Sequence, residues 1–331
     1  MILTADWHLV DTLSEEYRWR VFDELLFYSN QLQEDKEVFI LGDLTDRKDR
    51  HSAELVNRLC AEFVKLLKLG FTINIICGNH DMPLNGPPFW TFLNLIDDKL
   101  MFHIKPFVYK DVLLLPYSTK PNEDWADLLK DVTDYNAIFM HQPVRGAMME
   151  SGRAYETEEV INFPRNVQVW SGDVHTPQQI GQVRYVGAPH PIKFGDTYKC
   201  RMIQLDKRYN LIDEHAVATI QKLVLDISSV EELQKIKVRK YAQVKIRFQI
   251  DATQIAAWPV EREAITSWAL HKNIVLHSIE PSIILGERNV TKHVVLANNP
   301  VNILDDFATK EALGEKILEI GQRMLSKVLS K

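Results

Sequence analysis

The fold of this chain is indicated by residues 71–81, which read FTINIICGNHD. An apolar, β-branched run that ends abruptly in Gly-Asn-His-Asp is typical of a buried strand that carries polar groups at its carboxyl end. Asn79 and His80 are side chains that ligate a metal or contact a phosphate, and Asp81 is suited to support the turn. Taken alone, the four polar residues also fit a plain turn closed by an Asx hydrogen bond.

The residues before this stretch repeat the same pattern. Strands and helices alternate, with strands predicted at 1–5, 38–41 and 71–77 and helices at 14–33 and 52–69. Ser14 is the expected N-cap of the first helix, with two glutamates in the first turn where the helix dipole favours them. The first strand ends at Asp6-Trp7-His8 and the second at Gly42-Asp43. This alternation predicts an α/β sheet whose strands are buried on both faces.

Residues beyond 100 favour strands, and polar side chains follow two of them. The strands are expected at 107–116, 137–140, 167–170, 182–186 and 200–205. His141 follows the second of these, and Asp173 and His175 follow the third. The polar segment 144–166 between them predicts a long loop, and loops of that length in compact domains are often functional. Because ligands bind outside the carboxyl ends of strands in open α/β sheets, all these polar strand ends are expected to converge on one site.

The composition describes a globular chain with no excess of positive charge. Of its 331 residues 46% are hydrophobic and 25% charged, and the net charge is −6. That charge argues against a protein held on nucleic acid by bulk positive charge, but not against an enzyme whose metal ions supply it. Three scattered cysteines without a CxxC pair indicate a reducing compartment, and no apolar run reaches the length of a membrane span. The expected location is the cytoplasm.

The polar strand ends are oxygen and imidazole donors without a thiolate. They are Asp6, His8, Asp43, Asn79, His80, His141, Asp173 and His175. Such donors suit Mn, Mg, Fe or Zn rather than copper or an iron–sulfur cluster. They are more numerous than one ion needs, so they predict two divalent ions of the kind that activate a hydroxide and clamp a phosphoryl group during displacement.

At these residues the chain resembles the calcineurin-like metallophosphoesterases. The matching segments are Asp6-x-His8, Gly42-Asp43, Gly78-Asn79-His80-Asp81, His141 and Gly172-x-x-His175, in an order that covers residues 1 to about 205. The resemblance implies an α/β fold in which two β-sheets pack as a sandwich between helices. It also implies a di-metal site at one edge of the sandwich.

The resemblance further implies roles for individual residues. Asp6, His8 and His175 would hold one ion, Asn79, His141 and Asp173 would hold the other, and Asp43 would bridge the two. His80 would contact the phosphate and protonate or stabilise the leaving oxygen. Asp46 would orient the catalytic histidine and Arg47 would contact phosphate, as in the phosphatase version of the second motif.

One residue departs from the family pattern. The last motif of the family is Gly-His-x-His, and Asp173 stands where its first histidine is expected. A carboxylate ligand there adds negative charge and favours a harder ion such as Mn or Mg. The alternative is that Asp173 ligates poorly and the second ion binds weakly.

The residues after the predicted metal site point to DNA. The segment Tyr185-Val186-Gly187-Ala188-Pro189 resembles the Tyr-x-Gly-Ser-Pro segment of SbcD-type nucleases, which carry a small α+β capping domain and C-terminal helices that dock on an SbcC-type coiled-coil ATPase. The corresponding division is 1–205 for the nuclease domain, 206–290 for the α+β capping or DNA-binding domain, and 291–331 for a linker and docking helices. An apolar stripe over 313–328 fits such docking, although it could also pack on its own domain.

These observations predict a Mn-dependent DNA nuclease, the nuclease subunit of an SbcCD-like complex. The resemblance implies DNA and the ATPase as partners and a homodimer as the assembly, with no membrane involved. A second interpretation, favoured by Asp46-Arg47, is a phosphomonoesterase or cyclic-nucleotide phosphodiesterase of the same superfamily. A third, favoured only by Asp173, is a non-catalytic scaffold with a degenerate metal site.

Overall fold

The computed structural model describes residues 1–29, 36–130, 135–284 and 320–324. Two compact units are distinguished, one of residues 1–250 and 254–282 and the other of residues 251–253 and 283–331. The linker expected at the start of segment 291–331 lies outside the described residues. So does the helix expected at 313–328, apart from 320–324, which are helical.

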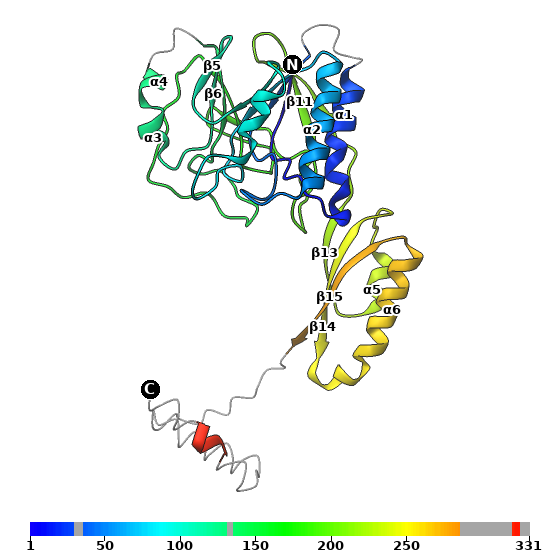
Figure 1. Ribbon diagram of the computed structural model, residues 1–331. Coiled ribbons are helices and arrows are strands. Elements are labelled where there is room, and N and C mark those ends of the chain that lie inside the picture. Colours follow the sequence, from blue (N-terminus) through cyan, green and yellow to red (C-terminus); the bar gives the residue numbers. More distant parts are fainter. Residues whose placement is uncertain (30–35, 131–134, 285–319, 325–331) are drawn as a thin grey trace. The chain divides into compact units, whose positions relative to one another are not determined.

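The first large sheet contains the three strands that were expected near the N-terminus. Its strand order is β12-β11-β1-β2-β3-β4, and β1 to β4 run parallel (Figure 1). The strands are β1 (Ile2–Thr4), β2 (Glu37–Ile40), β3 (Thr72–Ile76), β4 (Leu100–His103), β11 (Arg201–Leu205) and β12 (Leu211–Ala216). Because β12 pairs with β11, this sheet continues past residue 205. The division at 205 and 290 stays a prediction.

The second large sheet contains the strands that carry the later polar residues. Its order is β5-β6-β7-β8-β10-β9, with β6, β7, β8 and β10 parallel. The strands are β5 (Phe107–Tyr109), β6 (Val112–Leu115), β7 (Ala137–His141), β8 (Gln168–Gly172), β9 (Gln178–Ile180) and β10 (Val183–Tyr185). The single strand expected at 107–116 is therefore wrong: the chain reverses at Lys110, whose φ is 54°, and forms a hairpin.

The two large sheets pack face to face. Their inner faces share one apolar cluster that includes Leu3 and Phe39 of the first sheet and Phe139 and Trp170 of the second. The rings of Phe39 and Phe139 meet edge to face, with centroids 5.0 Å apart. This packing confirms the predicted two-sheet α/β sandwich.

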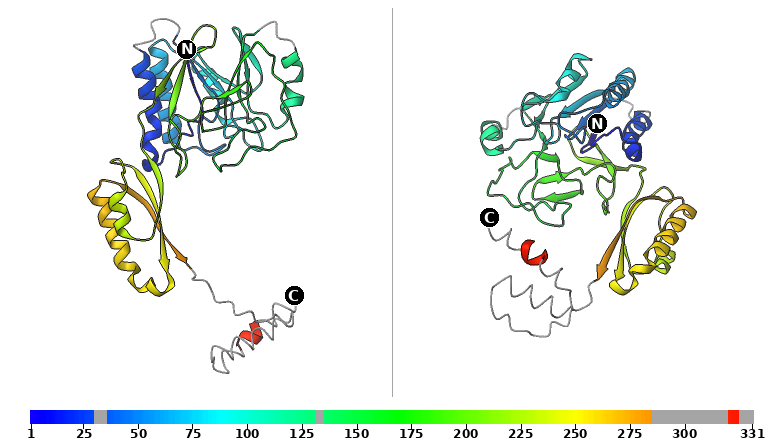
Figure 2. Two further views of the ribbon diagram at one scale, coloured as in Figure 1. Left: turned by 180° about the vertical axis from the view of Figure 1, so that it is seen from behind. Right: turned by 60° about the horizontal axis from the view of Figure 1, so that its bottom comes forward.

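Helices cover the outer faces of the sandwich. They are η1 (Leu13–Trp19), α1 (Arg20–Ser29), α2 (Ala53–Lys68), η2 (Phe89–Leu95), α3 (Pro121–Asp124) and α4 (Ala126–Lys130). In Figures 1 and 2, α1 and α2 lie side by side, and their Phe22 and Phe63 pack on Trp7 of the first sheet's outer cluster. Ser52 caps α2 by accepting a hydrogen bond from the Leu55 amide.

The expected helix start at Ser14 is wrong. The segment begins as a 3-10 helix at Leu13, and Thr12 occupies the capping position without a side-chain hydrogen bond. The reason is local competition, because the Glu15 carboxylate accepts hydrogen bonds from Tyr17 and Arg18 within the same turn. Those bonds stabilise the tighter 3-10 geometry before α1 begins at Arg20.

Residues after 220 form a small three-stranded sheet in the order β13-β14-β15, with α5 and α6 packed on one face (Figure 2). Its elements are β13 (Lys222–Ile227), α5 (Val230–Lys235), β14 (Gln243–Asp251), η3 (Ala252–Ala257), α6 (Trp258–His271) and β15 (Val275–Ile284). Phe248 of β14 and Trp268 of α6 belong to its apolar core. No helix among the described residues is long and apolar enough to cross a membrane.

Candidate metal centre

The polar strand ends of both sheets converge at one edge of the sandwich. Beyond the strands, the backbone continues to pair: the Asp6 amide donates to the Gly42 carbonyl at 3.1 Å and the His8 amide to the Asp43 carbonyl at 2.9 Å. From the second sheet, the Asp173 amide donates to the Asp6 carboxylate at 3.0 Å. The turns after β1, β2 and β8 are thus held against one another by hydrogen bonds.

Strained backbone marks the same turns. Four of the predicted ligands have positive φ, with values of 55° at Asp6, 43° at His8, 54° at Asp43 and 75° at Asp173. Residues other than glycine rarely adopt this left-handed region, and such strain concentrates at functional sites. The strained backbone at these four residues costs conformational energy, and it directs their side chains toward the same site.

Two glycines allow the turns to approach so closely. A Cβ atom on Gly42, whose φ is 87°, would lie 2.1 Å from Nδ1 of His141. A Cβ atom on Gly78 would lie 2.2 Å from Oδ1 of Asp43. Any side chain at either position would displace one of the predicted ligands.

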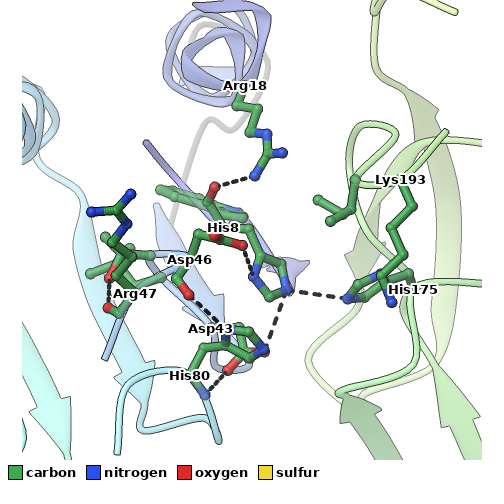
Figure 3. A network of polar contacts seen from close by, with 12 residues as sticks. His8, Arg18, Asp43, Asp46, Arg47, His80, His175 and Lys193 are labelled. Atoms are coloured by element: carbon green, nitrogen blue, oxygen red, sulfur yellow. Dashed lines mark hydrogen bonds and ion pairs between the residues drawn. The ribbon is translucent and has the colours of Figure 1, made fainter. Parts of the chain in front are cut away.

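The side chains meet at the spacing expected around a metal ion. Nε2 of His8 lies 3.2 Å from Nε2 of His175 and 3.4 Å from Oδ2 of Asp43 (Figure 3). Nε2 of His141 lies 3.4 Å from Oδ1 of Asp43. Ligand atoms at about 2.1 Å from one ion are roughly 3 Å apart when they subtend a right angle. Asp6 joins both groups, one with His8 and His175 and one with Asp43 and His141.

Several buried atoms in this cluster have no hydrogen-bond partner among the residues that the structure describes. Oδ2 of Asp6, Oδ1 of Asn79 and Nε2 of His141 make no hydrogen bond. A buried polar atom without a partner is costly, because burial removes the water that would otherwise solvate it. Oxygen and imidazole donors in this state fit a divalent ion, so the residues present match the metals that the sequence predicts.

Asp173, the departure from the family pattern, lies inside the cluster. Its carboxylate accepts a hydrogen bond from Nδ2 of Asn79 at 3.0 Å and lies 3.5 Å from Nε2 of His141. The structure therefore brings together all three residues predicted for the second ion.

His80 and Asp46 stand beside the ligand cluster. Nδ1 of His80 lies 2.7 Å from the main-chain carbonyl of Asp46, so this nitrogen must be the donor. The Asp46 carboxylate lies instead 3.5 Å from Nδ1 of His8. Arg47 is exposed, and Figure 3 shows its guanidinium pointing away from Asp43 and His80. Of the three predicted catalytic residues, Arg47 is thus the one that does not reach the cluster in this conformation.

Burial shifts the acid–base behaviour of the predicted ligands. It raises the pKa of Asp6 to about 7, with Asp43 and Asp173 adding to the rise and two histidines opposing it. It lowers the pKa of His8 to about 4. At His141 burial acts in the same downward direction, but the carboxylates of Asp43 and Asp173 outweigh it and raise the pKa. The cluster therefore retains protons that a metal ion must displace.

Two residues beside the cluster make contacts with it that the sequence does not indicate. Asp81 was expected to support its own turn, but its buried carboxylate also accepts hydrogen bonds from the Asp43 and Leu44 amides at 2.8 and 3.0 Å. Glu150 lies on the predicted long loop, and its carboxylate is 2.9 Å from Nδ1 of His175. No local pattern marks Glu150, because its partner is distant in the sequence.

Two hollows adjoin the cluster. One, of about 650 Å³, is lined by Leu9, Asp46, Arg47 and Arg50, and the Asp46 carboxylate in its wall lies 3.5 Å from Nδ1 of His8. The other, of about 490 Å³, is lined by Gln142, which follows His141, and by Tyr117, whose ring centroid is 6.4 Å from that of His141. Each hollow is therefore one residue removed from a predicted ligand, His8 in one case and His141 in the other, and the ligands themselves line neither.

Residues 1–177 match the family model of the calcineurin-like phosphoesterases. This match spans more than half of the 331 residues, and the chain belongs to this family. Its members are metal-dependent hydrolases that use divalent ions, and the buried ligand cluster fits that chemistry. No curated protein matches the chain. The resemblance to SbcD-type nucleases stays a prediction.

Proposed function

We propose that the chain is a DNA nuclease that hydrolyses phosphodiesters. The observation that carries this proposal is a pair of hollows near the cluster. One is lined by Asp46, whose carboxylate is 3.5 Å from Nδ1 of His8, and the other by Tyr117, whose ring centroid is 6.4 Å from that of His141. A phosphodiester continues on both sides of the scissile phosphate, whereas a monoester has a single substituent. A site with room on both sides suits the diester.

The side chains near one hollow also suit a nucleic acid. Arg47 and Arg50 line the hollow next to His8, where their guanidinium groups can contact phosphates that flank the scissile one. The hollow next to His141 is lined by Tyr117 and Tyr155, and aromatic rings provide stacking surfaces for unpaired bases. These contacts are local, so they are compatible with a net charge of −6.

The proposed chemistry assigns separate tasks to the protein's residues. Asp6, His8 and His175 would hold one divalent ion, Asn79, His141 and Asp173 a second, and Asp43 lies between the two groups. Such ions, when bound, supply positive charge to the phosphate oxygens and lower the pKa of a coordinated water. His80 donates through Nδ1 to the Asp46 carbonyl, which leaves Nε2 facing the substrate. When the ring also carries a proton on Nε2, that nitrogen can contact the phosphate and give this proton to the leaving oxygen.

We propose Mn as the resident metal, with Mg as the alternative. Three carboxylates in the cluster favour hard ions. We also retain an SbcC-type ATPase as the partner of residues 291–331 and a homodimer as the assembly, on the SbcD-type segment at Tyr185–Pro189. The ATPase would supply DNA contacts that an acidic chain lacks.

A phosphomonoesterase is the second candidate, favoured by Arg47, the residue at which the phosphatase version of the second motif contacts phosphate. Its exposed guanidinium, directed away from His80, would have to turn inward to do so. A non-catalytic scaffold is the third candidate. These candidates differ in substrate and in metal content.

A single assay series separates them. The protein, with and without the ATPase, is given Mn²⁺ or Mg²⁺ and tested on linear duplex DNA, bis(p-nitrophenyl) phosphate and p-nitrophenyl phosphate. We expect cleavage of DNA and of the small diester, and none in an Asp43→Asn preparation purified in parallel. Turnover of the monoester without DNA cleavage would refute the nuclease. No turnover and no bound metal would indicate the scaffold.

The hollows allow a sharper version of this test. Tyr117→Ala and Arg50→Ala each remove a side chain from one hollow while leaving the predicted ligands in place. Both variants should raise KM for DNA more than KM for the small diester, because only DNA extends into the hollows. Equal changes for both substrates would show that the hollows do not hold the substrate.

A further inference from the structure

His175 is contacted through both of its ring nitrogens. Its Nε2 faces the cluster, 3.2 Å from Nε2 of His8, and its Nδ1 lies 2.9 Å from Oε1 of Glu150. The Glu150 contact is close but is not aligned as a hydrogen bond. The side chains of both residues are largely buried, with 8% of His175 and 15% of Glu150 exposed. The carboxylate is therefore on the far side of the imidazole from the predicted ion.

Glu150 is delivered to His175 by an ordered part of the long loop. The strands of this loop pair through backbone hydrogen bonds from the Tyr155 amide to the Ala147 carbonyl, 2.7 Å, and from the Met149 amide to the Arg153 carbonyl, 2.9 Å. Gln178, on β9, exchanges two hydrogen bonds of 2.8 Å each with the backbone of Met148. The segment that carries Glu150 is thus attached to the strand that follows His175.

The second oxygen of Glu150 is also engaged. Nζ of Lys193 lies 2.7 Å from Oε2. The Glu150 carboxylate therefore lies between His175 and Lys193, and the lysine limits its rotation.

We propose that Glu150 is a positioning residue for the metal centre, which holds the His175 ring so that Nε2 points at the ion and makes that nitrogen a stronger donor. A carboxylate behind an imidazole favours the tautomer with the proton on Nδ1, which leaves the Nε2 lone pair for the metal. The inference rests on the metal site proposed above and not on DNA as the substrate. It also assigns a function to the loop 144–166 that composition alone does not reveal.

The test measures metal affinity and tautomer state separately. Mn²⁺ binding is followed by calorimetry in wild type, Glu150→Gln and Glu150→Ala, with Glu156→Gln, an exposed glutamate of the same loop, as the matched control. We expect Glu150→Ala to lose about 10- to 100-fold in Mn²⁺ affinity, the range for removal of a carboxylate behind a ligating histidine. Glu150→Gln should lose less, and Glu156→Gln should match wild type.

Nitrogen-15 NMR of the histidine rings in metal-free protein gives the second readout. We expect His175 in wild type to carry its proton on Nδ1, and the fraction of this tautomer to fall in Glu150→Ala. A merely structural role would lower the thermal midpoint without changing the tautomer. Wild-type affinity and an unchanged tautomer in both Glu150 variants would overturn the inference. If wild type itself binds no Mn²⁺, the metal site fails, and the tautomer still decides whether Glu150 orients His175.

Discussion

Replacing Asp81 with asparagine tests how the turns that carry the ligands are held together. The Asp81 carboxylate is fully buried and accepts hydrogen bonds from three backbone amides. Its Oδ2 atom accepts hydrogen bonds from the Asp43 amide at 2.8 Å and the Gly78 amide at 2.9 Å. Its Oδ1 atom accepts one from the Leu44 amide at 3.0 Å. One side chain thus joins the turn after β3 to the turn after β2.

The loss of folding free energy in Asp81→Asn is estimated from the hydrogen bonds that the substitution weakens or removes. In its better orientation the amide oxygen takes the place of Oδ2 and keeps the bonds to the Asp43 and Gly78 amides. The NH₂ group then faces the Leu44 amide, donor against donor, and that amide keeps only its long contact of 3.4 Å to the oxygen. A buried N–H left without a good acceptor costs about 1–3 kcal/mol. Each kept bond loses roughly 1 kcal/mol when its acceptor is no longer charged, a loss that applies above about pH 7, because burial raises the pKa of the Asp81 carboxyl to about 7. Relief from burying a charge offsets part of this sum. We expect the free energy of unfolding to fall by about 2–4 kcal/mol.

Urea unfolding followed by tryptophan fluorescence measures this change, with the exposed Asp98→Asn as control. Asp98→Asn should lie within about 0.5 kcal/mol of wild type, the usual range for surface substitutions. Asp81→Asn should also bind Mn²⁺ more weakly, because the turn that carries Asp43 loses its anchor. If Asp81→Asn were as stable as Asp98→Asn, the three hydrogen bonds would not be what holds these turns.

Three further predictions concern other parts of the chain. His80→Ala should lower turnover by about 10²–10⁴-fold, the usual contribution of a general acid, with metal content measured by mass spectrometry nearly unchanged; loss of both ions would show that His80 is a ligand. Burial and the charge of Arg18 lower the pKa of His190 well below its ordinary value, so the unfolded chain gains a proton that the native state does not. Stability should therefore decrease as pH falls below about 6.5, by up to roughly 1.4 kcal/mol per pH unit for this group. Urea titrations from pH 8 to 5.5 should show a shallower decrease for His190→Asn, and an identical slope would contradict this. Deleting residues 301–331 should leave the sandwich folded by circular dichroism and abolish co-purification with the ATPase; persistent co-purification would refute the docking helices.

The parts of the structure that the sequence predicts are those with local signals. The strands that end at Asp6, Asp43 and Asn79 were expected because apolar runs stop at polar turns. Asp6 and Asp43 lie together in one group of possible ligands, and Asn79 donates a hydrogen bond to Asp173 beside it. The start of α2 was also expected, because Ser52 precedes an amphipathic segment. The rule that strand ends meet at one edge then predicted the convergence of distant residues.

The parts that the sequence does not predict depend on distant contacts. β9 (Gln178–Ile180) is a polar edge strand with no apolar alternation, so its backbone pairing with β10 left no pattern. Glu150 lies among other polar residues and is distinguished only by its contact with His175. Ser14 has the residue type of a cap, but the hydrogen bonds of Glu15 decided the local geometry. The sequence does not show which of several neighbouring polar side chains forms a hydrogen bond or ion pair with a distant residue.

The aspartate at 173 bears on which metal the site holds. Asp6, Asp43 and Asp173 place three carboxylates in one buried cluster, and the last two add to the burial that raises the pKa of Asp6. A histidine at 173 would remove one of these charges and with it part of the repulsion. In this chain the three carboxylates repel one another, and four of the predicted ligand residues also have a strained backbone with positive φ. Divalent cations relieve the repulsion directly, and a carboxylate-rich site favours hard ions over zinc. We therefore infer that Asp173 adapts the site to Mn or Mg.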